Sequence, residues 1–116
     1  MIVDDDEANV RAFAALLEIE GFEVRSARDG IEAVTRIGPW VPHLIVLDIK
    51  LAGYDGFKVA SIIRNMRSTR EVGIVAATGY SDAELRTMGP LSHFDAVFRK
   101  GGDGAELVSL ARSILI

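Results

Sequence analysis

The stretch "HLIVLDIK", His43 to Lys50, decides the fold of this chain. Its centre, Leu44–Leu47, is a continuous apolar run of strand length, and such a run is typical of a strand that is buried on both faces. Helices that pack on each side of a parallel sheet bury its strands in this way. The run ends in a carboxylate, Asp48, and its place at the carboxyl end of a buried strand indicates a functional role.

Four more apolar runs accompany this one along the chain. The run "VGIVAA" is also continuous, while "FEVRSA" alternates between apolar and polar residues, as a half-buried strand does. Between the runs, apolar residues recur at helical spacing, for example in the helical pattern that Gly21 ends. We therefore expect strands at Met1–Val3, Phe22–Ala27, Leu44–Leu47, Val72–Ala77 and Asp95–Phe98.

Residues that can cap a helix stand before the helical patterns. An N-cap side chain accepts a hydrogen bond from one of the first free backbone N–H groups of a helix. Ser81 with Glu84, and Asp29 with Glu32, also have the spacing of a capping box. The helices are expected to start after Asp6, Asp29, Asp55, Ser81 and Asp103.

Strand and helix thus alternate five times, which predicts an α/β fold. It is a doubly wound, five-stranded parallel sheet with helices on both faces. The 116 residues suffice for one domain, which we expect to span 1–116. Both ends are abrupt, so we expect a fragment or a trimmed domain of a longer protein.

Composition excludes several classes of function. The chain has no cysteine, which removes disulfides, thiolate chemistry and Cys-ligated zinc. Its net charge is −4 and its 13 Lys and Arg residues are scattered, so no basic face for direct nucleic-acid binding is predicted. No apolar run is long enough to span a membrane, and the start does not resemble a signal peptide, which favours the cytoplasm.

Functional groups follow four of the five expected strands. Asp4 and Asp5 end the first, Asp48 the third, Thr78 the fourth and Lys100 the fifth. In parallel α/β sheets, ligands bind at this carboxyl edge. If the first and third strands are neighbours, they lie about 4.8 Å apart, and their carboxylates repel one another.

A divalent cation would resolve that repulsion, and hard oxygen ligands favour Mg²⁺. A hydroxyl and an ammonium complete the set that can hold a phosphoryl group on a carboxylate oxygen. An aspartate can act as the nucleophile and form an aspartyl phosphate. Catalysis of such a transfer is mostly positioning and charge neutralisation.

The chain resembles the CheY-like response-regulator receiver family of two-component signalling over essentially its whole length. The segments "IVDDD", "LIVLDIKLAGYDGF", "AATGYSD" and "FDAVFRK" carry the resemblance through their order and spacing. The resemblance implies the flavodoxin-like (βα)5 fold with strand order 2-1-3-4-5.

It also implies a magnesium site. By position, Asp48 resembles the phosphoacceptor, which is also a metal ligand. Asp5 resembles a direct Mg²⁺ ligand, and Asp4 resembles a ligand that acts largely through water. The backbone carbonyl of Lys50 matches the third protein ligand.

Three further positions match groups that contact the phosphate in the family. Thr78 resembles the switch hydroxyl, and Lys100 resembles the phosphate-binding lysine. The backbone N–H of Gly79 would also face the phosphate.

Three positions depart from the family pattern. Ala52 and Gly101 stand where the family often has proline. Gly101 argues against the cis peptide bond that usually holds the lysine, because cis bonds are rare without proline. Val97 replaces an aromatic residue, and strand alternation turns the neighbouring Phe98 to the opposite face. We therefore expect phosphate capture to be intact and the aromatic signalling switch to be altered.

The favoured function is that of a phosphoacceptor rather than a turnover enzyme. The domain takes phosphate from a histidine kinase or a histidine phosphotransfer protein and changes the face that it offers to an output domain or a partner protein.

Three alternatives remain. An Mg²⁺ phosphatase usually has an acid two residues after its nucleophile, and Lys50 stands there. A receiver-shaped interaction module that no longer accepts phosphate is favoured by Ala52, Val97 and Gly101 and disfavoured by the intact acidic, hydroxyl and lysine set. A nucleotide-binding flavodoxin-like domain is disfavoured by the acidic turn after the first strand.

Overall fold

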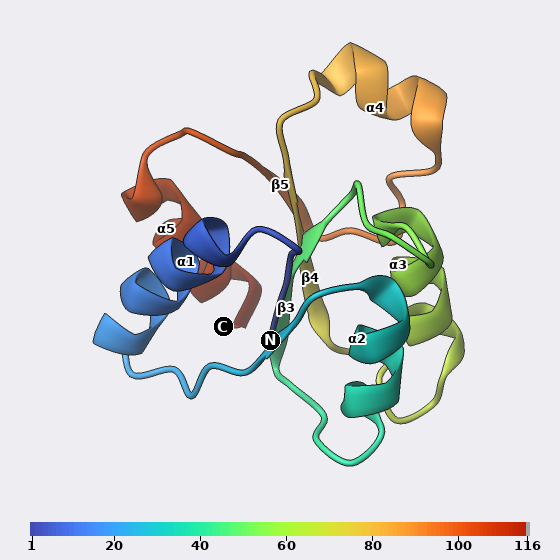
Figure 1. Ribbon diagram of the computed structural model, residues 1–116, viewed down its shortest axis with the longest axis horizontal. Helices are drawn as coiled ribbons and strands as arrows, with labels where there is room; N and C mark the ends of the chain where they lie inside the picture. Colours follow the sequence, from blue (N-terminus) through green and yellow to red (C-terminus); the bar gives the residue numbers. More distant parts are fainter. Residues whose placement is uncertain (116) are drawn as a thin grey trace.

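The computed structural model describes residues 1–115 of the chain, so the predicted end at Ile116 lies outside the described residues. Five parallel strands form one sheet in the order β2-β1-β3-β4-β5, and a helix follows each strand along the chain (Figure 1). The predicted doubly wound fold and its strand order are confirmed. The elements are β1 (Ile2–Val3), α1 (Glu7–Ile19), β2 (Ser26–Ala27), α2 (Gly30–Ile37), β3 (Leu44–Asp48), α3 (Gly56–Asn65), β4 (Gly73–Thr78), α4 (Asp82–Met88), β5 (Ala96–Arg99) and α5 (Gly104–Leu115).

The two faces of the sheet carry separate hydrophobic cores. Figure 1 shows α1 and α5 on one side of the sheet and α2 and α3 on the other. Leu44 and Val46 of β3 pack with residues of α1 and α5, while Ile45 and Leu47 pack with residues of α2 and α3. All five residues of β3 are buried, as its continuous apolar run predicts.

Strand boundaries are where the sequence prediction is least accurate. The strand expected at 22–27 forms only at its end, as Ser26–Ala27. The reason is its partner: β1 has two residues, Ile2 and Val3, and these pair with Ser26 and Ala27. β4 and β5 each begin and end one residue later than expected.

Helix starts agree with the predicted caps. The carboxylates of four capping aspartates each accept a hydrogen bond from a backbone N–H in the first turn, and Ser81 does so with its hydroxyl. At Ser81 the bond is reciprocal, because the Glu84 carboxylate accepts from the Ser81 backbone N–H at 3.0 Å. The four aspartates are Asp6, Asp29, Asp55 and Asp103.

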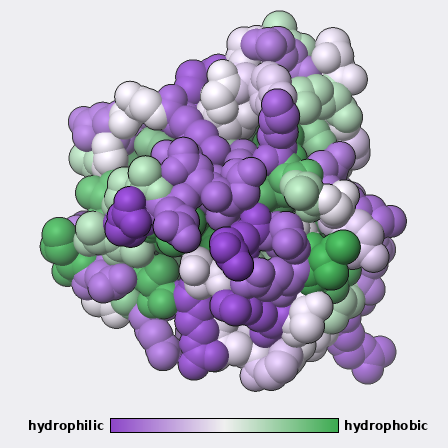
Figure 2. All heavy atoms as spheres, in the orientation of Figure 1, coloured by the Kyte–Doolittle hydropathy of each residue, from purple (hydrophilic) through white to green (hydrophobic). Residues whose placement is uncertain are grey.

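The surface in view is mostly hydrophilic, with hydrophobic residues gathered in small separate patches (Figure 2). Across residues 1–115, the structure contains no helix with the length and apolar character needed to cross a membrane.

Candidate functional site

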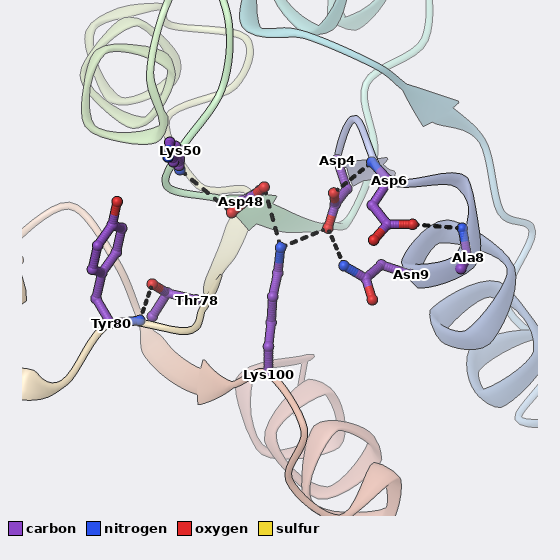
Figure 3. A network of polar contacts seen from close by, with 9 residues as sticks. All are labelled: Asp4, Asp6, Ala8, Asn9, Asp48, Lys50, Thr78, Tyr80 and Lys100. Atoms are coloured by element: carbon purple, nitrogen blue, oxygen red, sulfur yellow. Dashed lines mark hydrogen bonds and ion pairs between the residues drawn. The ribbon is translucent and has the colours of Figure 1, made fainter.

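The carboxyl edge of the sheet brings the predicted site residues together (Figure 3). Asp4 and Asp5 follow β1, and Asp48 is the last residue of the adjacent strand β3. Asp4, Asp5 and Asp48 each offer a carboxylate oxygen, and these oxygens lie within 4.8 Å of one another. The predicted crowding of three carboxylates from neighbouring strands is therefore confirmed.

Lys100 contacts carboxylates at the ends of two other strands. It follows β5, which is two strands away from β3. Its Nζ lies 3.1 Å from Asp48 Oδ2 and 3.0 Å from Asp4 Oδ2, so one ammonium bridges two strand ends. Asp4 is 2% exposed and Asp48 6%, and water therefore screens these two ion pairs poorly.

Asp4 is the most firmly held carboxylate of the site. Its Oδ1 accepts a hydrogen bond from the backbone N–H of Asp6 at 2.9 Å. Its Oδ2 accepts one from the Asn9 side-chain amide at 3.4 Å, in addition to the contact with Lys100. Asp5 is exposed. Asn9 has no place in the sequence prediction, although its position in the first turn of a helix that directly follows the acidic pair could have indicated it.

Burial and the charges of neighbouring groups shift the pKa of Asp48 and of Lys100. Burial is the largest cause that raises the pKa of Asp48, and the charge of Asp4 adds to it, while Lys100 works in the opposite direction. Burial alone would lower the pKa of Lys100. Its hydrogen bond to Asp4 and the charges of Asp48 and Asp4 outweigh burial, so that the pKa of Lys100 lies above its ordinary value.

Thr78 lies at the end of β4 and is 1% exposed. Its hydroxyl oxygen accepts a hydrogen bond from the backbone N–H of Tyr80 at 3.0 Å, which leaves the hydroxyl proton for donation. The Thr78 carbonyl accepts from the backbone N–H of Lys100 at 2.8 Å. The switch hydroxyl and the phosphate-binding lysine of the sequence prediction are thus joined through the backbone.

A cavity of about 600 Å³ lies above these groups. Nearly all of the predicted site residues line it, including Lys50 and Gly79. A second cavity, of about 320 Å³, lies at the opposite, amino edge of the sheet and has a mainly apolar lining. The lining of the first cavity consists of Asp5, Asp48, Lys50, Leu51, Ala52, Thr78, Gly79, Tyr80 and Lys100.

The donor set of this cavity fits a divalent cation. Asp4, Asp5 and Asp48 form the one group of at least three possible metal-ligating side chains within residues 1–115. One ammonium leaves the three carboxylates only partly neutralised. Hard carboxylate oxygens suit Mg²⁺, and the exposed Asp5 beside the cavity leaves room for the part of its water shell that this ion keeps.

The departures from the family pattern have clear structural positions. Val97 packs against the cluster of Ile49, Ala76 and Leu85 on the α4 side. Phe98 points to the opposite face, where its ring meets Phe13 edge-on with centroids 6.0 Å apart. This confirms the predicted alternation. Gly101 has a φ of +87°, and residues 1–115 contain no cis peptide bond.

Known proteins are similar to this chain in sequence and in fold. The family model of the response regulator receiver domain matches residues 1–112. Response regulator PleD of Caulobacter vibrioides is 33% identical over 114 residues, which are 98% of this chain and 25% of PleD. The polar-differentiation response regulator DivK of Brucella ovis is 32% identical over 81 residues, which are 70% of this chain and 66% of DivK.

A similar solved structure is that of a CheY-like response regulator receiver domain protein from Methanospirillum hungatei JF-1. It has a TM-score of 0.87 at 27% identity and covers 98% of this chain and 90% of that one. The fold of the present chain is therefore that of receiver proteins, and the chain spans about a quarter of the length of PleD.

Proposed function

This chain belongs to the response regulator receiver family, and we propose that it accepts a phosphoryl group on Asp48 with the help of Mg²⁺. The donor would be the phosphohistidine of a histidine kinase or of a histidine phosphotransfer protein. The observation that carries the proposal is the convergence of Asp5, Asp48 and Lys100 from three strand ends on one cavity, with the buried Asp4 in contact with Lys100 behind them. Thr78 is the last residue of β4, the strand that lies between β3 and β5.

In the proposed reaction an Asp48 carboxylate oxygen forms a bond to phosphorus. The phosphorus–nitrogen bond to the donor imidazole breaks, and its electron pair returns to the imidazole, which takes up a proton. Lys100 would pair with the oxygens of the transferred group, as it pairs with Asp48 in the resting site. Thr78 would donate its hydroxyl proton to one of these oxygens, and the Gly79 backbone N–H would face the same group.

Asp5 and Asp48, the Lys50 carbonyl and, through water, Asp4 would hold the magnesium ion. When bound, the ion neutralises charge shared between the carboxylates and the incoming phosphoryl group. Lys100, which in the resting site is the one ammonium that contacts both Asp4 and Asp48 within residues 1–115, would then be free to leave Asp4. Its ammonium would pair with the phosphoryl oxygens while remaining near Asp48.

The proposed role is signalling from the cytoplasm rather than turnover. Phosphorylation would change one surface of the domain, and an output domain or a partner protein would bind differently to that surface. Phosphatase activity has less support, because Lys50 is exposed where a general acid would be expected, two residues after the nucleophile. A module that no longer accepts phosphate also has less support, because the Asp48–Lys100 and Asp4–Lys100 contacts are in place despite Ala52, Val97 and Gly101.

Intact-mass spectrometry after incubation with Mg²⁺ and acetyl phosphate tests the proposal. We expect one added phosphoryl group on the wild type, and none on Asp48→Asn or in excess EDTA. Steady release of phosphate over many turnovers would instead favour a phosphatase. Equal labelling of the Asn variant would contradict the assignment of Asp48.

A further inference from the structure

Arg99 holds the segment that leads into α4. It is the last residue of β5 and directly precedes Lys100. While the Lys100 side chain reaches the acids, the Arg99 guanidinium reaches the loop that follows β4. Its Nη1 donates to the Tyr80 carbonyl, and its Nη2 lies 2.9 Å from Asp82 Oδ1. Asp82 is the first residue of α4, so the Arg99 side chain contacts both the loop and the start of the helix.

Tyr80 is therefore held from two directions. Its backbone N–H donates to the Thr78 hydroxyl, as Figure 3 shows, and its carbonyl accepts from Arg99. A movement of the Thr78 hydroxyl strains the first bond, and a movement of Tyr80 strains the second. Thr78, Tyr80 and Arg99 thus form a continuous chain of hydrogen bonds from the site to α4.

Few other contacts hold α4 in place. It has seven residues, and Leu85 is its one buried residue. Figure 1 shows α4 standing away from the sheet at the ends of two extended connections. The Arg99 and Asp82 side chains are 46% and 67% exposed, so water screens their ion pair and the contact can open at small cost.

We propose that Arg99 is a positioning residue that keeps Tyr80 and the first turn of α4 in the resting arrangement. When Thr78 turns its hydroxyl towards the phosphoryl group on Asp48, Tyr80 moves. The Arg99 guanidinium then loses its paired contacts with Tyr80 and Asp82. Arg99 thereby provides a polar link between the site and α4. Val97, which packs against the cluster that contains Leu85, lacks the hydrogen-bonding group of a tyrosine. The trigger rests on the proposed function, whereas the resting contact does not.

The test compares the wild type with Arg99→Ala, Arg99→Lys and Asp82→Asn. Arg67→Ala is the control, because it removes an equally charged, exposed side chain beyond the end of α3. Amide chemical shifts of residues 80–82 are measured without phosphodonor and compared with those of the phosphorylated wild type. Initial rates of Asp48 phosphorylation by acetyl phosphate with Mg²⁺ are measured on the same proteins.

We expect Arg99→Ala to move these amides towards their positions in the phosphorylated wild type. It should also raise the initial rate about three- to tenfold, which corresponds to the loss of an exposed ion pair and one hydrogen bond. Arg99→Lys and Asp82→Asn should give smaller changes in the same direction, because each retains only part of the bidentate contact. Arg67→Ala should change neither quantity.

Amides 80–82 that keep their wild-type positions in Arg99→Ala would overturn the proposal. Amides that move while the rate stays unchanged would also overturn it, since a merely structural contact gives that result. If the wild type takes no phosphate, the proposed function fails separately. The resting contact is then judged by hydrogen exchange of the α4 amides. Faster exchange in Arg99→Ala would support the contact, and exchange equal to wild type would reject it.

Discussion

At the scale of single residues, Asp48 combines a functional position with an unfavourable environment. The residue is 6% exposed and its carboxylate lies beside Asp4, and both conditions oppose its ionisation. Lys100 offsets this only in part, so that the pKa of Asp48 remains above its ordinary value. A residue selected only for stability would not be an aspartate at this position.

We therefore predict that Asp48→Asn stabilises the metal-free protein at pH 7. With a raised pKa in the folded state, Asp48 costs stability fully above that pKa. The cost disappears as the pH falls towards about 3.9, the ordinary value for aspartate. The free energy of unfolding, measured by urea denaturation in EDTA, should thus be higher for the variant at pH 7, and the two proteins should converge in acid.

Asp103→Asn provides the control for this experiment, because Asp103 is an exposed cap and asparagine caps helices about as well. The difference in free energy of unfolding between Asp103→Asn and the wild type should vary little with pH. An Asp48→Asn variant that is less stable than wild type at pH 7 would show that the ion pair with Lys100 outweighs the cost of burial.

At the scale of elements, the start of α3 sets the position of Asp48. Gly56 is the first residue of α3, and its backbone N–H donates to the Ile49 carbonyl at 2.8 Å. A Cβ at Gly56 would lie 2.5 Å from the Asp48 carbonyl oxygen, which is far closer than normal contact. The helix can approach the strand end this closely only because residue 56 has no side chain.

Gly56→Ala should therefore destabilise the protein by about 1–3 kcal/mol, the usual cost of overpacking a close contact. Alanine has a higher helix propensity than glycine, so propensity alone would predict that Gly56→Ala stabilises the protein. Gly104→Ala is the matched control at the first residue of α5, where the new Cβ would meet the end of the flexible Leu16 side chain at 2.7 Å.

Urea denaturation of both variants makes this comparison direct. We expect the free energy of unfolding to fall clearly in Gly56→Ala and less in Gly104→Ala. The reason is that a leucine methyl group can rotate away from the new Cβ, whereas a backbone carbonyl cannot. Equal losses would mean that the backbone of α3 moves as freely as the Leu16 side chain. Weaker phosphorylation of Gly56→Ala at full folding would indicate that Asp48 has shifted.

At the scale of the whole molecule, the site exists only in the folded state. Asp4 and Asp48 are far apart in sequence, and the pairing of β1 with β3 brings them together. A cation that binds this arrangement and not the unfolded chain must stabilise the fold, by about 2.7 kcal/mol at a concentration one hundred times its dissociation constant. Stability therefore reports binding without any phosphodonor.

We predict that saturating Mg²⁺ raises the thermal midpoint of the wild type by several degrees. Asp5→Asn should lose most of this rise, because it removes the exposed carboxylate of the group while leaving the buried contacts of Lys100 in place. A monovalent salt at equal ionic strength controls for screening. The same rise in Asp5→Asn, or with the monovalent salt, would contradict a specific magnesium site.

The sequence by itself determined the order of elements and the chemical composition of the site. Continuous apolar runs predicted the strands that are buried on both faces, β3 and β4, because burial on two sides requires apolar residues at every position. The caps were predictable because a cap acts within one helical turn. The acids, Thr78 and Lys100 were predictable because they directly follow recognisable strands.

Only the tertiary structure decided which groups the long side chains reach. The bridge from Lys100 to Asp4 and Asp48 and the Arg99 contacts with Tyr80 and Asp82 all join segments that are distant in sequence. The length of β2 likewise depends on its partner, β1. These features depend on charged side chains and strand backbones that come together only after the strands have paired. A local pattern records the burial of its own residues and carries no information on which distant segment will lie beside them.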